Sequence, residues 1–532
     1  MTIKSSFPDV DIPNVSVYDF IFGTLAADDE SKVALIDGPS GVQTTFGALK
    51  GQVDAFAGAL AARGIGVGDV VALHAPNVPA FVTAFHGILR SGATATTVNV
   101  LYTAEEMARQ LIDSEARLVI TVSAFLAVAG DAAAGAGLGG DQIVVLDGAE
   151  GYVSARELLA LQAVPPQVSF DPATHLAVLP YSSGTTGAPK GVMLTHRNLV
   201  ANVAQALPKL DVSNEDTVLA VLPFFHIYGM TVLLNLSLRA RARLVTMPRF
   251  ALADFLQIVQ DTRCTWVFIA PPIAVALAKH PLVEDFDLSS VEVVLSGAAP
   301  LDEALGRAVE HRLGVTVLQG YGMTELSPIS HVIPRDRTDL SIGSIGLTLP
   351  NIEIAIVDTT TGKEVDVPDE GLSEPGELWV RGPNVMTGYL NNPEATAATV
   401  TEDGFLRTGD IARVDAEGVV WIVDRLKELI KYKGYQVAPA ELEALLLTHP
   451  AIADAAVVAY PDEDAGEIPK AFVVRQEGSA LIGEDVIAFV ADHVAAHKKV
   501  RRVEFIDVIP KSSSGKILRK DLRTRPEPVE IG

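Results

Sequence analysis

A short run rich in glycine and hydroxyl side chains is the part of this sequence best suited to binding a polyphosphate. Residues 182–191 read Ser-Ser-Gly-Thr-Thr-Gly-Ala-Pro-Lys-Gly. Glycines let the backbone approach an anion closely, the serines and threonines add hydroxyl donors, and Lys190 adds a positive charge. The order is not that of a Walker A loop, in which Lys is followed by Ser or Thr. The alternative is a flexible surface turn, but a flexible linker has no need of a residue that restricts the backbone as Pro189 does.

Residues 192–200, directly after this run, have helix-like character, and the start of a helix is a common place for a phosphate.

Two other clusters combine a hydroxyl group with a carboxylate. The first reads Gln319-Gly-Tyr-Gly-Met-Thr-Glu325, in which Thr324 could donate to a phosphate and Glu325 could hold Mg²⁺. Its alternative is a helix cap formed by the threonine, with the glutamate at the helix terminus. The second is Thr408-Gly-Asp410, whose carboxylate suits two ribose hydroxyls, although aspartate in a turn also has local uses.

A lysine near the C-terminal end and a histidine near the middle complete the candidates. Residues 511–516, Lys-Ser-Ser-Ser-Gly-Lys, contain the same residue types as the phosphate run, namely serine, glycine and lysine. It is either a solvated tail or a mobile loop that delivers one lysine to an active site. His226 lies in Pro-Phe-Phe-His-Ile-Tyr-Gly, and no second histidine or carboxylate stands at metal-ligand spacing, which excludes a metal role.

The elements that must position these groups follow an alternating pattern over residues 15–350. An amphipathic stretch is repeatedly followed by a short apolar run, which predicts α/β layers with largely parallel strands. The pairs are Thr45–Ala62 with Val70–His74, Ala80–Arg90 with Ala93–Val98, and Asp254–Asp261 with Trp266–Ile269.

The pattern changes after residue 350. Short strands bounded by Gly and Asp predict a β-rich module over residues 350–425. Beyond it, helices are expected at Ala440–Thr448 and Gly483–His493, and strands at Ala455–Ala459 and Ala471–Arg475. This order predicts a small α+β domain of about a hundred residues.

Composition sets further bounds. The chain has 532 residues, 48% of them hydrophobic, and a formal net charge of -25. Such an acidic surface excludes nucleic acid and anionic membranes as general partners. The only cysteine, Cys264, allows no intramolecular disulfide and no thiolate metal site, and its neighbours predict a buried strand. No apolar run approaches the roughly twenty residues of a membrane span and no signal peptide is recognisable, so we expect a cytoplasmic protein.

The order of these motifs resembles that of the adenylate-forming superfamily, which contains acyl- and aryl-CoA synthetases, luciferases and peptide-synthetase adenylation domains. The resemblance spans about residues 30–522. Asp424–Glu441 and His226-Ile-Tyr are most similar to the 4-coumarate–CoA ligases. It implies an α/β fold with a large multi-layer N-terminal domain (1–424), a hinge (425–429) and a small mobile α+β C-terminal domain (430–532) that acts as a catalytic lid.

The resemblance also implies roles for individual residues, with ATP, Mg²⁺ and CoA as the small molecules bound. The residues expected to hold the ATP phosphates are Ser182, Ser183, Gly184, Thr185, Thr186 and Lys190. Other expected nucleotide or metal contacts are Thr324 (α-phosphate), Glu325 (Mg²⁺), Asp410 and Arg425 (ribose), and Gln319, Gly320 and Tyr321 (beside adenine). Lys516 would reach between the substrate carboxylate and the α-phosphate, a placement that would stabilise charge in the transition state.

The remaining implied residues concern the acid, CoA and the hinge. Lys427 matches the hinge and would also contact the nucleotide, as would Lys431. Lys431, Gln436 and His226 match residues that act in catalysis. Arg249, Lys433 and Gly434 match CoA contacts, and Tyr228, Ala298, Gly320 and Gly322 would line the acid pocket.

The expected reaction joins a carboxylic acid to CoA through an acyl-AMP intermediate. Small residues around the predicted pocket favour a flat hydroxycinnamate such as 4-coumarate or cinnamate. A medium-chain fatty acid fits nearly as well. A luciferase-like oxygenase and a carrier-loading adenylation enzyme are less favoured, the latter because Phe225-His-Ile-Tyr carries no aspartate to recognise an ammonium group. A non-catalytic paralogue is disfavoured because Lys190, Glu325, Asp410 and Lys516 are all present.

Overall fold

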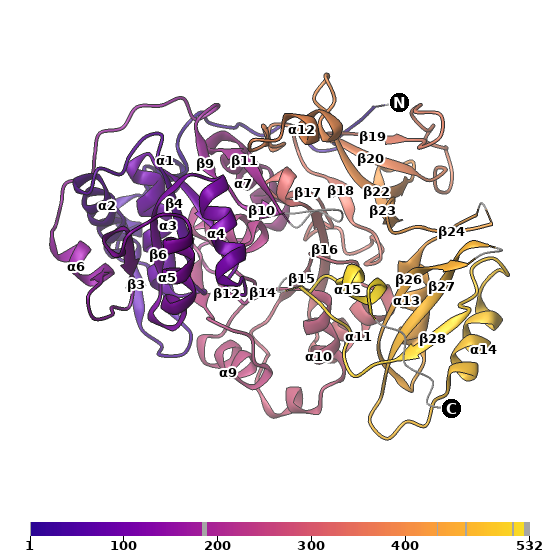
Figure 1. Cartoon of the computed structure of the whole chain (residues 1–532). Coiled ribbons are helices and arrows are strands. Elements are labelled where there is room, and N and C mark those ends of the chain that lie inside the picture. The colour runs from indigo at the N-terminus through magenta and orange to yellow at the C-terminus, as the bar shows by residue number, and fades with distance from the viewer. Residues whose placement is uncertain (1, 183–188, 434, 463–464, 513–514, 526–532) are drawn as a thin grey trace. The chain divides into compact units, whose positions relative to one another are not determined.

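The residues divide into two units, and each is described by itself. A computed structural model describes residues 2–182, 189–433, 435–462, 465–512 and 515–525 (Figure 1). The large unit consists of Lys4–Glu353 and Val380–Leu406, and the small unit of Met1–Ile3, Ile354–Trp379 and Arg407–Gly532. Four of the predicted phosphate contacts (Ser183, Gly184, Thr185 and Thr186) and the predicted CoA contact Gly434 lie outside the described residues.

One sheet of the large unit carries the phosphate run at its edge. Its strand order is β10-β11-β9-β5-β4-β6-β7-β8, with β21 paired to β11. The strands are β4 (Val70–His74), β5 (Thr94–Thr97), β6 (Ala116–Thr121), β7 (Ile143–Val145), β8 (Val153–Ser154), β9 (Leu176–Val178), β10 (Tyr181–Ser182), β11 (Lys190–Thr195) and β21 (Gly388–Tyr389). Strands β4 to β9 pair in parallel, whereas β10, β11 and β21 join by antiparallel pairing.

Helices cover this sheet where the sequence has its amphipathic stretches. They are α3 (Pro79–Ser91), α4 (Ala104–Asp113), α5 (Leu126–Gly135) and α6 (Ala155–Ala160), and α2 (Phe46–Ala62) packs on α3. α4 begins with a capping box in which Thr103 and Glu106 bond each other's backbone amides. α4 and α5 lie against β6 (Figure 1), and Met107, Ala129 and Val119 share a fully buried core there.

The second sheet of the large unit carries the Glu325 segment. Its order is β18-β17-β16-β15-β14-β12-β13-β2-β3, and β2, β13, β12, β14, β15 and β16 are parallel. The strands are β2 (Val33–Asp37), β3 (Gln43–Thr45), β12 (Thr217–Ala220), β13 (Arg243–Thr246), β14 (Trp266–Ile269), β15 (Val293–Ser296), β16 (Thr316–Gly322), β17 (Ile329–Val332) and β18 (Gly346–Thr348).

The helices that accompany this sheet include one unusual element. They are α1 (Val17–Phe22), α7 (His196–Leu210), the π-helix η4 (Tyr228–Asn235), α8 (Leu236–Ala240), α9 (Leu252–Thr262), α10 (Pro271–Lys279) and α11 (Glu303–Leu313), whereas α12 (Pro393–Thr399) packs against β21 of the first sheet. The short 3₁₀ turns are η1 (Ala27–Asp29), η2 (Ser123–Phe125), η3 (Gly140–Gln142), η5 (Pro281–Asp285) and η6 (Thr324–Leu326). A π-helix is rare and is often found at functional sites.

The small unit holds a β-rich part and an α+β part. The first contains β19 (Glu353–Val357), β20 (Gly376–Arg381), β22 (Leu406–Val414) and β23 (Val419–Arg425) in that spatial order. The second contains β24 (Ile430–Tyr432), β25 (Tyr435–Val437), α13 (Pro439–Thr448), β26 (Ile452–Asp462), β27 (Gly466–Arg475), α14 (Gly483–His493), β28 (Arg502–Phe505) and α15 (Arg519–Arg523). A two-residue strand, β1 (Ile3–Lys4), precedes everything. Leu442, Val457 and Val473 belong to the buried core that α13 and α14 share with β26 and β27.

The predicted α/β class is confirmed, and so are the β-rich module and the order of elements in the C-terminal region. The expected helix over residues 192–200 is wrong at its start. Lys190–Thr195 is strand β11, and α7 begins only at His196, where Thr195 accepts the amide of Asn198 and caps the helix. The apolar run Val192–Leu194 pairs with β9 and β21, and this sheet pairing overrides the weak helical preference of the segment. The boundaries 1–424, 425–429 and 430–532 stay predictions.

Candidate active site

An antiparallel hairpin frames the phosphate run. Ser182 in β10 lies opposite Lys190 in β11, and Tyr181 lies opposite Gly191. The first hydroxyl and the lysine of the predicted loop are therefore fixed as neighbours, although they are separated in the chain by the glycines and threonines. After Lys190 the chain continues as strand β11, and α7 begins only at His196, so Lys190 is not at the N-terminus of a helix.

Glu325 is the centre of a polar cluster in the large unit. Its side chain is buried, and its Oε1 accepts hydrogen bonds from the Ser182 hydroxyl at 3.1 Å and from the Tyr389 hydroxyl at 2.9 Å. The Lys190 ammonium lies over the Tyr389 ring, 4.7 Å from its centroid. Ser182 thus bonds Glu325 directly, and Lys190 is connected to Glu325 through Tyr389. The cluster places a carboxylate and an ammonium beside the phosphate run.

Tyr389 is a residue that the sequence analysis missed. It belongs to the two-residue strand β21, in which it lies opposite Val192 of β11. Burial and the neighbouring Glu325 carboxylate raise the pKa of the Tyr389 hydroxyl, so the hydroxyl keeps its proton and acts as a donor. No motif surrounds Tyr389; only its pairing with β11 brings it to the site.

The turn after β16 presents Glu325. Gly322 ends the strand, and a Cβ at this position would lie 2.3 Å from the Pro328 carbonyl oxygen, so only glycine fits. The carbonyl of Glu325 accepts the amide of Met386, which fixes the backbone of η6. Thr324 is the first residue of η6 and its half-buried side chain does not cap the turn, since Met323 holds the cap position.

Other predicted residues of this segment have structural partners. Gln319 is buried, and its amide accepts the Leu301 N–H and donates to the carbonyls of Ile342 and Ser344. It therefore ties two loops together. Tyr321 meets His331 edge to face, with centroids 5.9 Å apart. A Cβ on Gly320 would lie 3.4 Å from the Ile329 side chain, so this position has little spare room.

Two of the predicted acid-binding residues, Tyr228 and Ala298, lie at the start of η4 and just after β15. Tyr228 opens the π-helix, and a Cβ on Gly297 would lie 2.8 Å from its ring. The Tyr228 hydroxyl is buried, and no described residue gives it a hydrogen-bond partner. Ala298 follows with a φ of 72° and is half-buried. The ring therefore packs directly on the backbone that precedes Ala298.

His226 lies one turn before the π-helix and is half-buried. Its Nδ1 accepts the amide of Tyr228 at 3.3 Å, and its carbonyl accepts the amide of Met230. The imidazole therefore fixes the entry to η4, and its Nδ1 is an acceptor in this arrangement.

Asp410 and Arg425 meet within the small unit. They lie opposite each other in β22 and β23, and the Arg425 Nε is 3.0 Å from the buried Asp410 carboxylate. The turn before Asp410 is fixed by neighbours: the Thr408 hydroxyl donates to the Leu378 carbonyl, and the Gly409 amide donates to Glu377. Asp410 is thus held in one position beside a half-exposed guanidinium.

The lysines of the predicted hinge and CoA site lie on the surface of the small unit. Lys427 and Lys431 are exposed, and the Lys431 amide donates to Glu467. Lys433 is exposed with a φ of 48°, and its ammonium lies 5.9 Å from the Tyr432 ring centroid. Gln436 pairs through its backbone with Lys431 across β24 and β25. In the large unit, Arg249 lies in an exposed turn after β13.

Lys516 lies in the turn that precedes α15. Its amide donates to the Ser512 hydroxyl at 3.1 Å, and its side chain is half-buried. Lys511 and Ile517 form an isolated β-bridge across the same turn. The turn is therefore ordered at its base.

Two exclusions hold for the part of the chain that the structure describes. No cluster of three or more His, Cys, Asp and Glu side chains could hold a metal ion there, and no helix in it is long and apolar enough to cross a bilayer. Cys264 is buried as expected, and burial raises the pKa of its thiol to about 12, so it is no nucleophile.

Comparison with known proteins defines the family. Residues 23–390 match the family model of the AMP-binding enzymes, and residues 441–516 match that of the AMP-binding enzyme C-terminal domain. The chain therefore belongs to the AMP-binding enzyme family. It is an adenylate-forming enzyme, as its motif order predicts.

Similar proteins include a plant ligase and two bacterial enzymes of known structure. 4-Coumarate–CoA ligase 5 of Oryza sativa subsp. japonica is 43% identical over 537 residues, which cover 98% of this chain and 97% of that protein. ATP-bound MatB from Rhodopseudomonas palustris aligns with a TM-score of 0.87 at 29% identity, over 96% of this chain and 98% of that one. A benzoate CoA ligase from Burkholderia xenovorans LB400 aligns with a TM-score of 0.85 at 27% identity, over 96% and 100%.

Proposed function

We propose that this chain is an ATP-dependent carboxylic acid–CoA ligase that acts on phenylpropenoates, either a hydroxycinnamate such as 4-coumarate or cinnamate itself. The observation that carries the proposal is the cluster of Ser182, Lys190 and Tyr389 around the buried Glu325 carboxylate. This cluster supplies hydroxyl, ammonium and carboxylate groups at the edge of a glycine-rich run, which is the chemistry that a nucleoside triphosphate with its cation requires. The plant relative named as a 4-coumarate–CoA ligase supports the same activity.

The hydrogen bonds at Glu325 leave one carboxylate oxygen suited to a divalent cation. Both hydroxyls bond Oε1, and no described residue donates to Oε2. Because the described residues offer no multi-carboxylate cage, Mg²⁺ held by Glu325 would complete its shell with phosphate oxygens and water. When bound, the ion would neutralise charge on the phosphates.

The proposed reaction has two steps. The substrate carboxylate attacks the α-phosphorus of ATP, pyrophosphate leaves, and acyl-AMP forms. The CoA thiol then attacks the acyl carbonyl as its proton departs, and AMP leaves. Lys190 would bind the departing phosphates, Asp410 would accept the ribose hydroxyls beside Arg425, and Lys516 would place its ammonium between the attacking carboxylate and the α-phosphate. Phosphoryl chemistry of this kind depends on positioning and charge stabilisation.

The predicted acid pocket favours a planar, hydroxylated acid. Tyr228 is packed on Gly297 beside Ala298, and its buried hydroxyl has no partner among the described residues. A buried polar group without a partner is costly, and the hydroxyl of a phenolic substrate would satisfy it. An aryl ring would also stack beside the tyrosine ring. The benzoate CoA ligase among the similar structures is a precedent for an aryl acid on this fold.

The test is CoA-dependent AMP release from ATP with 4-coumarate, cinnamate, caffeate, benzoate, octanoate and an amino acid. We expect the phenylpropenoates to give the highest kcat/KM. A preference for octanoate would agree with the two-step reaction but would contradict the assignment of a phenylpropenoate as the substrate. AMP release that does not require CoA would contradict the ligase activity. The same conclusion would follow if none of these acids supported AMP release.

The assignment of Lys516 has its own test. Lys516→Ala should lower acyl-AMP formation by at least about 10²–10³-fold, as expected for the loss of one transition-state donor. Thioester formation from supplied acyl-AMP should be largely retained. Lys433→Ala should instead slow the thiol step, because Lys433 is assigned to CoA. Equal losses in both steps for Lys516→Ala would remove the assignment.

A further inference from the structure

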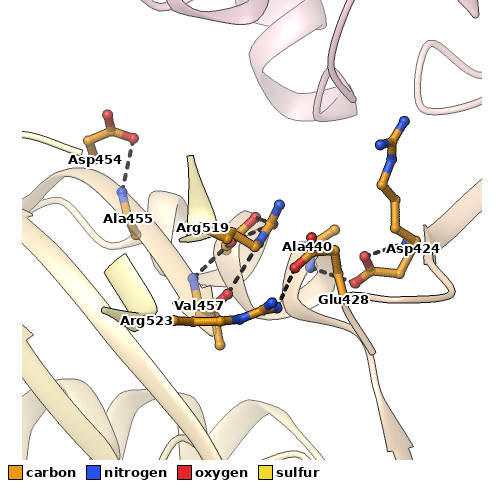
Figure 2. Close-up of polar contacts among 10 residues, drawn as sticks. Asp424, Glu428, Ala440, Asp454, Ala455, Val457, Arg519 and Arg523 are labelled. Carbon is orange, nitrogen blue, oxygen red and sulfur yellow. Dashed lines mark hydrogen bonds and ion pairs between the residues drawn. The ribbon is translucent and has the colours of Figure 1, made fainter. Parts of the chain in front are cut away.

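Two arginines that follow Lys516 are held by buried carboxylates of the small unit (Figure 2). The Arg519 guanidinium donates to both oxygens of Glu443, at 2.7 and 2.6 Å, and its Nε donates to the Val457 carbonyl at 3.3 Å. Arg523, one turn further along α15, pairs with Glu428. α15 is therefore attached at two points.

The Arg519–Glu443 pair is buried and well bonded. The side chains are 16% and 11% exposed. Glu443 lies on α13, and its Oε1 also accepts the amide of Val457 in β26 at 2.8 Å. Burial raises the pKa of Glu443, and the guanidinium opposes this by favouring the ionised form. Nη2 donates to both carboxylate oxygens and Nε to the Val457 carbonyl, so two nitrogens of one planar group fix the direction of the Arg519 side chain as well as its distance.

The other end of the Lys516 turn is anchored too. The Lys511 ammonium lies 2.6 Å from the Asp454 carboxylate, which belongs to β26. The amide of Leu518 donates to the Pro510 carbonyl at 2.8 Å. Residues 510–518 are thus closed at their base, with one ion pair before Lys516 and another after it. Both carboxylates belong to the α13–β26 layer, so the backbone of Lys516 is tied to the core of the small unit.

We propose that Arg519, held by Glu443, is the positioning residue for Lys516 in acyl-AMP formation. The proposal rests on the function proposed above and extends it to a residue that touches no substrate. The Arg519 guanidinium lies three residues after Lys516, so it fixes the point at which the Lys516 turn enters α15. Loss of this anchor displaces the ammonium, and a misplacement of about 1 Å at a reacting centre can cost about 10²-fold in rate.

Arg523 adds a link to the predicted hinge. Glu428 follows Lys427 directly and is buried, and Arg523 reaches it from the far end of α15. The helix after Lys516 thus connects the α13–β26 core with residues 425–429. The Arg523–Glu428 pair therefore supports the positioning of Lys516 as well, because both ion pairs hold α15 in place.

The experiment compares the two half-reactions of Arg519→Met. Adenylation is followed as ATP–pyrophosphate exchange with 4-coumarate, and thioester formation is followed from supplied coumaroyl-AMP and CoA. We expect adenylation kcat to fall at least about 10-fold, with the KM for ATP and the thioester rate each within about threefold of wild type. Arg519→Lys should fall between the two proteins, because lysine keeps the charge beside Glu443 but lacks the second nitrogen that bonds the Val457 carbonyl.

The matched control is Lys498→Met. Lys498 bonds both oxygens of Glu441 at 2.7 Å, on the same helix α13 that carries Glu443, but it does not belong to the Lys516 turn. This variant should leave both half-reactions unchanged. A loss equal to that of Arg519→Met would show that any ion pair on α13 has the same effect, and would overturn the proposal.

A double variant separates positioning from folding. Arg519→Met with Glu443→Leu removes both charges, so no carboxylate remains buried alone, and the small unit should fold. Adenylation should still be reduced. Recovery of the wild-type rate would refute positioning by Arg519.

Hydrogen exchange provides a readout without substrate. In Arg519→Met, the amides of residues 515–523 should lose more protection than those of β26 and β27, whose protection should fall only with the global stability. Unchanged exchange in this segment would overturn the anchor. If wild-type protein adenylates no acid while the exchange result holds, the proposed function fails and the anchor stands.

Discussion

Replacing Tyr389 with phenylalanine removes one hydroxyl from the Glu325 carboxylate and leaves the aromatic ring in place. Ser182 continues to donate to Oε1 at 3.1 Å, and the ring under the Lys190 ammonium is retained. The substitution therefore isolates the 2.9 Å hydrogen bond between the Tyr389 hydroxyl and Glu325. No other described partner of the carboxylate changes.

The expected size follows from the kind of bond that is lost. A hydrogen bond to a charged group contributes about 1.5–3 kcal/mol, and about 1.4 kcal/mol corresponds to a tenfold change in rate. If Glu325 holds the cation that neutralises the phosphates, loosening it lowers adenylation kcat by about 10-fold to about 150-fold. The Mg²⁺ concentration for half-maximal rate should rise as well, while the KM for the acid stays near the wild-type value.

The assay is ATP–pyrophosphate exchange at saturating 4-coumarate, with Mg²⁺ varied at constant free ATP. Tyr18→Phe is the matched control. The Tyr18 hydroxyl donates to Asp54 at 2.7 Å and the Arg90 guanidinium lies 4.7 Å from its ring centroid, so the same chemistry is removed elsewhere in the large unit. The control should lose stability but not activity.

Two results would contradict a role for the Tyr389 hydroxyl in holding Glu325. A Tyr389→Phe rate within twofold of wild type with an unchanged Mg²⁺ dependence would show that the hydroxyl does not support Glu325 in the reaction. A change confined to the KM for the acid would instead indicate that this cluster binds the acid and not the cation.

Three further predictions concern the acid pocket, a buried carboxyl group and the anchor of α15. Gly297→Ala places a methyl group where a Cβ would lie 2.8 Å from the Tyr228 ring, so kcat/KM for 4-coumarate should fall at least about 10-fold in the same exchange assay with little change in the KM for ATP. Burial raises the pKa of Asp424 from 3.8 to about 6, so the folded state holds this proton more tightly, and the free energy of unfolding should fall by about 2 kcal/mol as pH rises from 4 to 7. Asp424→Asn cannot titrate and should lose this part of the slope in denaturant titrations; an unchanged slope would contradict the raised pKa. Arg519→Met leaves the Glu443 carboxylate buried without its partner and should cost about 3–5 kcal/mol, most of which Glu443→Leu should restore in the double variant; additive losses would contradict this pairing.

Local signals in the sequence were enough for most of the fold. The period of the apolar residues predicts α2 and α3, and the turn residues bound the short strands of the β-rich module. The segment after the phosphate run shows where local signals fail. Val192–Leu194 is equally apolar in a helix or a strand, and its pairing with β9 and β21, distant in sequence, makes it a strand.

The same distinction applies to the site. The residue types and their order define the AMP-binding family and single out Ser182, Lys190 and Glu325, because these groups stand in short runs with recognisable chemistry. The sequence alone did not reveal Tyr389 or Arg519. Tyr389 reaches Glu325 across 64 residues, and Arg519 reaches Glu443 across 76.

Neither contact has a local signature, since a tyrosine in a two-residue strand and an arginine in a short helix are common surface residues. Strand pairing and the packing of α15 bring them to their carboxylates. The sequence therefore determined which chemical groups this protein carries and the family to which it belongs. The tertiary structure decided which of those groups meet, because a hydrogen bond to a buried carboxylate depends on distances that only the assembled sheets fix.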